Sequence, residues 1–163
     1  DLGEQLKTMG LLVITDAILN RVTENWKAGR RTHVYLDEFH VVYENPYSSM
    51  FFTSAWRRFR KRNAFPTGIT QNVEYLLDNV SARSMLSNSE FIVMHNQAAS
   101  DREKLAALFN ISEQQMNYIT NAEAGHGLMK IGNALVPFVN RFPKNTELYK
   151  RMTTKPGETE LWG

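Results

Sequence analysis

Residues 33–39, HVYLDEF, restrict the fold of this chain more than any other segment. A short apolar run followed at once by two acids is typical of a buried strand that presents carboxylates at its C-terminal end. A long helix is predicted before it, over residues 2–28, because apolar side chains recur there every three or four positions and Gly29 provides a stop. A helix that leads into a buried strand indicates an α/β protein.

The rest of the chain supplies further strands and helix starts. The segment EFIVMHN, residues 90–96, is the clearest buried strand in the sequence. Gly132-Asn133 predicts a hairpin turn, and Pro137 places the strand after it at the edge of a sheet. Capping patterns that begin at Ser100 and Ser112 each predict the start of a helix.

Together these signals predict an alternation of helices and strands. Helices are expected over 47–63, 73–78, 81–88, 100–109, 112–120 and 146–152, and strands over 65–71, 90–96, 128–131 and 134–139. The alternation predicts an α/β fold in which a mostly parallel sheet is flanked by helices and carries a C-terminal hairpin.

Composition excludes several classes of protein. The 163 residues include 19 Lys and Arg against 17 Asp and Glu, and this net charge of +2 is too balanced to indicate nucleic-acid binding. Cysteine is absent from the sequence, and no apolar run approaches the roughly 20 residues that span a bilayer. We therefore expect a soluble, cytosol-facing domain. The start at Asp1 without Met and the polar C-terminal segment lead us to expect a piece of a longer protein, with residues 158–163 as a tail.

The two acids after the first strand have the pattern of a Walker B element. In such an element the first carboxylate, Asp37, holds a magnesium ion through water, and the second, Glu38, polarises the water that attacks the phosphate. Two other interpretations stay open: a strand that runs into a solvated turn, and a metal site built from His33, Asp37, Glu38 and His40. Strand alternation places His33 and Asp37 on one face and Glu38 on the other, which disfavours the metal site.

Two further features accompany this element. Gln71, at the predicted end of the next strand, can hydrogen-bond a water and a γ-phosphate and so sense hydrolysis, although a polar loop residue is the simpler interpretation. Basic residues gather near the end of the helix predicted over 47–63: Arg57, Arg58, Arg60, Lys61 and Arg62. They allow three interpretations: a solvated helix face, a nucleic-acid stripe, or an arginine finger that reaches the nucleotide of a neighbouring subunit.

In order and spacing these features resemble the energising ATPases of conjugative type IV secretion systems, the VirB-four, TraE and TraC class, in the HerA–FtsK branch of RecA-like motors. YLDEFH at 35–40 is similar to the Walker B block of the family, and WRRFRKRNAFPTGITQN at 56–72 to its basic helix and glutamine motif. Later blocks at 86–112, 124–138 and 149–158 resemble its following strand and helix, hairpin and tail. The resemblance implies that residues 1–157 form the C-terminal portion of a RecA-like ATPase domain, from Walker B onward.

The resemblance also implies roles for individual residues. Asp37 matches the magnesium position, Glu38 the catalytic base, Gln71 the sensor glutamine, and Arg60, in preference to its basic neighbours, the arginine that acts in trans. ATP and Mg²⁺ are the implied cofactors, and a hexameric ring is the implied assembly. The implied partners are secretion-channel and coupling proteins, and the implied location is cytoplasmic, at the periphery of the bacterial inner membrane. His126 departs from the family pattern, in which many relatives have glutamine at this place.

A second departure concerns the phosphate-binding loop. No G-x-x-x-x-G-K-[ST] occurs among the 163 residues, so the chain has half of an ATP site, and we expect it to be inactive alone. In the family the P-loop strand lies between the strands that correspond to 65–71 and 90–96. Without it, we expect these two strands to pair with each other or with another copy of the chain. Two other functions stay open: a DNA-translocating motor of the coupling type, and a non-enzymatic interaction module with a degenerate motor fold.

Overall fold

The computed structural model describes residues 3–153, and the chain divides into two compact units. The first unit is Asp1–Ser89 and the second is Glu90–Gly163. Helices and strands alternate along the chain and a hairpin lies in the second unit, so the predicted α/β class is confirmed. The tail predicted at 158–163, and residues 154–158 of the last family-like block, lie outside the described residues.

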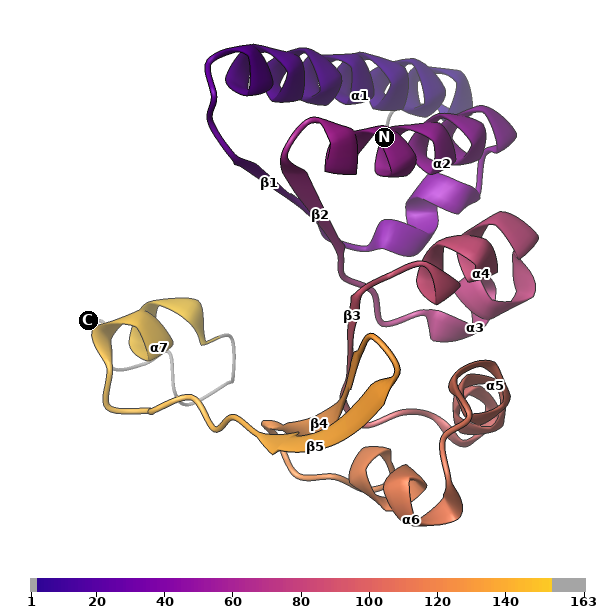
Figure 1. Cartoon of the computed structure of the whole chain (residues 1–163), viewed down its shortest axis with the longest axis vertical. Coiled ribbons are helices and arrows are strands. Elements are labelled where there is room, and N and C mark those ends of the chain that lie inside the picture. The colour runs from indigo at the N-terminus through magenta and orange to yellow at the C-terminus, as the bar shows by residue number, and fades with distance from the viewer. Residues whose placement is uncertain (1–2, 154–163) are drawn as a thin grey trace. The chain divides into compact units, whose positions relative to one another are not determined.

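The first unit is built around a pair of parallel strands (Figure 1). β1 (Thr32–Leu36) pairs with β2 (Ala64–Gly68), with Thr32 opposite Ala64 and Leu36 opposite Gly68. α1 (Glu4–Lys27) leads into β1, and α2 (Pro46–Lys61) leads into β2. Both helices therefore end where the strands begin. The unit is completed by the 3-10 helix η1 (Phe39–Tyr43), α3 (Val73–Asp78) and α4 (Val80–Ser87).

One face of α2 forms the core of this unit. The side chain of Asn45 caps α2 by accepting a hydrogen bond from the Tyr47 N–H, and Pro46 lies in its first turn. Buried residues form two clusters on α2: Phe39, Val42, Tyr43, Phe52, Leu76, Ala82 and Met85 in one, and Val22, Ala55, Phe59 and Ala64 in the other. The first cluster joins α2 to η1, α3 and α4, and the second joins it to α1 and β2.

β1 is less buried than its sequence predicts. Its residues alternate between half-buried and exposed, and Tyr35 is 69% exposed. The exposed positions carry rings that stack on one another, with His33 centred 5.2 Å from Phe65 and 6.4 Å from Tyr35. The expectation of a fully buried strand is therefore wrong for the described residues, because only one face of the pair is covered.

The second unit contains a three-stranded antiparallel sheet in the order β3-β4-β5. Its strands are β3 (Phe91–Met94), β4 (His126–Ile131) and β5 (Ala134–Val139), and its helices are α5 (Ala99–Phe109), α6 (Glu113–Met116), η2 (Asn117–Ile119) and α7 (Glu147–Met152). The predicted hairpin is confirmed: Gly132 has a φ of 55° in the turn, and β5, with Pro137, is an edge strand. No helix among residues 3–153 is long and apolar enough to cross a membrane.

Two expectations for this unit are wrong in detail. The strand predicted over 90–96 is covered on one face only, since Met94 is 3% exposed whereas Phe91 is 64% and Val93 50% exposed among the described residues. Ser112 forms the predicted capping box with Gln115, but the N-cap of α5 is Ala98 rather than Ser100, because the backbone turns helical earlier.

Parallel pairing among the described residues is confined to β1 and β2. β2 belongs to the first unit and β3 to the second, and the direct pairing of these two strands stays a prediction. Pairing of either strand with another copy of the chain stays a prediction.

Gly68 leaves no space for a side chain, which gives a test of the packing at β2. A Cβ atom added there would lie 2.7 Å from Cδ1 of Phe39, a residue that is 2% exposed. We expect Gly68→Ala to lower the free energy of unfolding by about 1–3 kcal/mol in urea denaturation, because the buried ring has to shift. Gly10→Ala is the control: nothing lies within 4 Å of its added Cβ, and alanine favours α1 by up to about 1 kcal/mol. An equal loss in both variants would contradict the contact.

Candidate active site

Backbone hydrogen bonds tie together the loops that follow β1 and β2. The Ile69 N–H donates to the Leu36 carbonyl, and the Phe39 N–H donates to the Ile69 carbonyl, both at 2.8 Å. The pairing of the two parallel strands thus extends past their ends. Residues 37–40 and 69–71 are therefore held at the same edge of the sheet, where the side chains of neighbouring parallel strands meet.

Glu38 occupies a left-handed backbone conformation, with φ 46° and ψ 47°. For a residue other than glycine this conformation costs about 1–2 kcal/mol. The Glu38 N–H donates to Oδ1 of Asp37 at 3.0 Å, which stabilises the turn. Strand alternation already places positions 38 and 40 on one face, and the side chains of Glu38 and His40 stay together through the turn.

The side chains of Glu38 and Gln71 meet at this edge. The Gln71 amide donates from Nε2 to Oε1 of Glu38 at 3.4 Å, and Nδ1 of His40 lies 3.3 Å from the other carboxylate oxygen, Oε2. His40 Nδ1 is also 3.0 Å from the Thr70 hydroxyl, which in turn accepts the Asn72 N–H at 3.1 Å. Glu38 is half exposed and can take a proton from a water, while Gln71 keeps an acceptor oxygen and a second amide hydrogen for a ligand.

His40 and Thr70 are the members of this cluster that sequence reasoning missed. His40 was considered only as a metal ligand together with His33, which instead stacks on Phe65. The position of His40, two residues after Glu38 and close to a threonine of the next loop, is the sequence feature that could have indicated its contact with Glu38. Gln71 itself lies three residues past the end of β2 rather than at the end of the strand as predicted.

Asp37 is exposed and keeps one carboxylate oxygen free of the hydrogen bond to the Glu38 N–H. Mg²⁺ in phosphoryl-transfer sites is commonly held by one or two carboxylates and several waters, which this side chain can provide. Among residues 3–153 no group of three or more histidines and acids is placed to hold a metal directly. The four-residue metal site considered for His33, Asp37, Glu38 and His40 is therefore not formed by the described residues.

Arg60 lies at the opposite end of the strand pair from Glu38. It belongs to the last turn of α2, which leads into the start of β2, whereas Glu38 follows the end of β1. A five-residue strand separates the two edges by about 13 Å. The Arg60 side chain is exposed and makes no hydrogen bond or ion pair within residues 3–153, and the same holds for Arg57 and Lys61, whereas Arg58 donates to Ser54 and Arg62 donates to Thr23.

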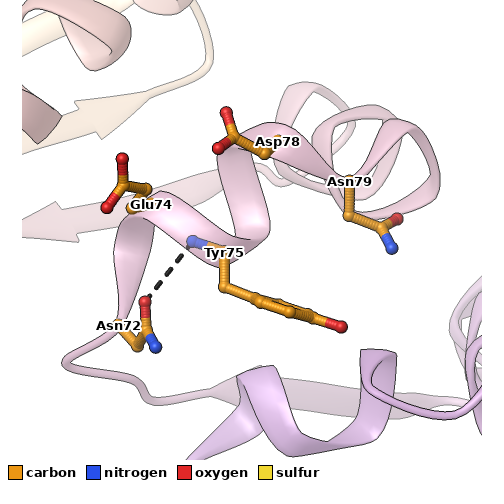
Figure 2. Close-up of a pocket in the computed structure, with 5 residues that line it drawn as sticks. All are labelled: Asn72, Glu74, Tyr75, Asp78 and Asn79. Atoms are coloured by element: carbon orange, nitrogen blue, oxygen red, sulfur yellow. Dashed lines mark hydrogen bonds between the residues drawn. The ribbon is translucent and has the colours of Figure 1, made fainter.

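An open hollow of about 440 Å³ lies beside α3. It is lined by Asn72, Glu74, Tyr75, Asp78 and Asn79. Figure 2 shows Glu74 and Asp78 on one side of α3 and the Tyr75 ring on the other. The Asn72 side chain caps α3 by accepting the Tyr75 N–H at 3.4 Å, and the Tyr75 hydroxyl donates to the Tyr43 carbonyl at 3.2 Å. Burial raises the pKa of the Tyr43 phenol, which stays protonated and donates to Met85 Sδ. These contacts fix α3 against η1 and hold the loop that carries Gln71.

Comparison with solved structures finds a similar protein. VirB4 of Thermoanaerobacter pseudethanolicus has a similar structure, with a TM-score of 0.63 and 26% sequence identity over 69% of this chain. No protein-family model matches the chain, and no curated protein matches it. The match confirms the resemblance to the VirB-four class and is consistent with a RecA-like fragment. It spans 32% of the VirB4 chain, about a third of its length.

The link between His40 and Thr70 generates a prediction for the loop geometry. Thr70→Val removes the hydroxyl that contacts His40 Nδ1 and the Asn72 N–H, and we expect the free energy of unfolding to fall by about 1 kcal/mol or somewhat more. Thr70→Ser keeps the hydroxyl and is the control, measured by the same thermal or urea denaturation. Equal stability of the valine and serine variants would show that these hydrogen bonds do not hold the loop.

Proposed function

We propose that this chain carries the hydrolytic half of the ATP site of a motor that energises conjugative transfer by type IV secretion. The observation that carries the proposal is the contact between Glu38 and Gln71, from loops after two adjacent parallel strands, beside the exposed Asp37. A carboxylate and an amide that meet at this edge suit the activation and sensing of a water. The structural match to VirB4 supports an ATPase as the parent protein.

Each residue of the site has a distinct role in this proposal. Glu38 accepts a proton from the attacking water through Oε1 or Oε2, and Gln71 orients that water with its free amide hydrogen or carbonyl. Asp37 would hold Mg²⁺, which would supply neutralisation of the phosphate charge when ATP is bound. His40 contacts the Oε2 side of Glu38 and positions the carboxylate.

The rest of the ATP site must come from residues other than these 163. The phosphate cradle needs a glycine-rich loop at a helix N-terminus, and the 163 residues contain no Walker A sequence. We therefore propose that these residues alone do not hydrolyse ATP. In the parent motor we propose a hexameric ring at the periphery of the bacterial inner membrane, with secretion-channel and coupling proteins as partners.

The position of Arg60 supports a role in trans. An exposed arginine without a partner among the described residues, at the edge opposite Glu38, cannot complete the site of its own chain. A neighbouring subunit in a ring can present its own Arg60 to that site, where a guanidinium stabilises the charge that develops on the transferred phosphoryl group.

Substitution of Glu38 tests the catalytic assignment in the parent protein. We expect Glu38→Gln to bind ATP and Mg²⁺ but to hydrolyse ATP at least about 100-fold more slowly, because the base is lost while the shape is kept. Asp37→Ala should instead weaken binding of the magnesium–nucleotide complex. Turnover is measured by phosphate release and binding with a fluorescent nucleotide. Glu44→Gln, an exposed acid of the same unit, is the control, and unimpaired turnover of Glu38→Gln would exclude Glu38 as the catalytic base.

Mixing of subunits tests the role of Arg60. Subunits with Arg60→Ala, combined with subunits whose phosphate-binding loop is inactivated, should regain part of the ATPase activity, because each supplies what the other lacks. Arg57→Ala, exposed on the same helix and without a side-chain partner among residues 3–153, should retain activity by itself. Failure of rescue at every mixing ratio, with both variants folded by circular dichroism, would exclude a finger in trans.

A further inference from the structure

The small net charge of the chain hides a strong segregation of charge in the first unit. Residues 21–31 and 57–65 contain nine of the 19 basic side chains and one of the 17 acidic ones, Glu24. The rest of the chain has ten basic and 16 acidic side chains and is therefore negative. The balance that argued against nucleic-acid binding in the sequence does not hold at this end of the molecule.

These two segments lie together at the edge where β1 and β2 begin, here named the amino edge. Arg62 donates from Nη1 to the Thr23 hydroxyl at 2.6 Å, and the Thr32 N–H donates to the Asn63 carbonyl at 3.2 Å. The segments also share the cluster of Val22, Ala55, Phe59 and Ala64. Because α1 and α2 both end at this edge, their basic C-terminal turns are brought side by side (Figure 1).

Most of the positive charge at the amino edge is unpaired. Six exposed side chains make no hydrogen bond or ion pair within residues 3–153: Lys27, Arg30, Arg31, Arg57, Arg60 and Lys61. Glu24, the acid of this edge, lies 3.9 Å from Arg21. The C-terminal ends of two helices carry about half a negative charge each, which accounts for one or two cations but not for six. Four of the six are arginines, whose planar guanidinium suits phosphate oxygens.

The exposed apolar side chains of the amino edge indicate which kind of polyanion fits it. Both are aromatic: Trp26, in the last turn of α1, is 48% exposed, and Phe65, at the start of β2, is 46% exposed and stacked on His33. Exposed aromatic rings among unpaired cations provide stacking surfaces for unpaired bases beside contacts for phosphates. Insertion into a bilayer needs a continuous apolar face, and residues 21–31 and 57–65 expose no large apolar side chain besides these two rings.

We infer that the amino edge of β1 and β2 binds single-stranded nucleic acid, with Lys27, Arg30 and Arg31 on phosphates and Trp26 stacked on a base. This site lies at the opposite edge from Glu38 and Gln71, and it does not depend on the ATPase assignment. Binding is sequence-tolerant, because both contacts recognise features that every nucleotide shares.

The experiment measures fluorescence anisotropy of a labelled 20-nucleotide oligothymidylate with the complete 163-residue chain at several salt concentrations. We expect the combined variant Lys27→Ala, Arg30→Ala, Arg31→Ala to bind at least about tenfold more weakly, and the slope of log K against log salt to become about 2 smaller, at roughly 0.7 per lost phosphate contact. Trp26→Ala should weaken binding about tenfold with the slope unchanged, whereas Trp26→Phe should keep most of the affinity.

The control removes three charges elsewhere, as Arg83→Ala, Arg102→Ala, Arg151→Ala, and circular dichroism melting checks that every variant is folded. Unchanged binding in the Lys27, Arg30 and Arg31 variant, or an equal loss in the control, would overturn the assignment. Binding to vesicles of phosphatidylglycerol and phosphatidylcholine without binding to the oligonucleotide would identify a membrane surface instead and would also overturn it. None of the substituted residues belongs to the proposed ATP site, so failure here leaves the Glu38 and Arg60 experiments unaffected.

Discussion

The hydrogen-bond ladder between β1 and β2 is the interaction on which the first unit depends. It runs through five residue pairs and continues past the strands, where Leu36, Ile69 and Phe39 exchange backbone hydrogen bonds. This continuation fixes where the chain turns after each strand, and the burial of Phe39 anchors it to the core. A side chain one residue before this anchor, Glu38, is thereby held against Gln71, which lies 33 positions away in the sequence. The proposed chemistry is a property of this pairing and not of either loop alone.

Parallel pairing also explains why the two ends of the sheet differ in charge. Parallel strands need a connection that returns to the starting edge, and in this unit α2 makes that return. Residues at helix C-termini therefore collect at one edge, and the loops after the strands collect at the other. Lys27 and Arg60 reach the first edge, while Asp37 and Glu38 reach the second. The chain topology alone therefore places the basic residues at one edge of the strand pair and the acidic residues at the other.

The sequence predicts the elements well and their surroundings less well. Period and turn residues suffice to locate the helices, the hairpin at Gly132 and the adjacency of the loops that carry Glu38 and Gln71, because these depend on local pattern and on parallel topology. The burial predicted for both faces of 90–96 is wrong for the face that carries Phe91 and Val93. An apolar pattern indicates that a strand face can be covered, but it does not show that another segment covers it. Strand alternation places positions 38 and 40 on one face, but their contact lies in a turn with a left-handed Glu38, a conformation that no propensity predicts for glutamate. Net charge averages over both edges and therefore does not report the excess of basic side chains in residues 21–31 and 57–65.

The left-handed backbone at Glu38 lowers the stability of the fold, while the proposed chemistry needs a carboxylate at this position. Glycine or asparagine would relieve the strain at this position, so selection for stability alone would not retain a residue with a long carboxylate side chain. The Asp37 side chain, the ladder and the buried Phe39 together hold the conformation in place. Stability spread over the whole unit thus maintains one unfavourable residue, which means that weakening the distant core of α2 reduces the population of molecules in which the carboxylate is correctly oriented.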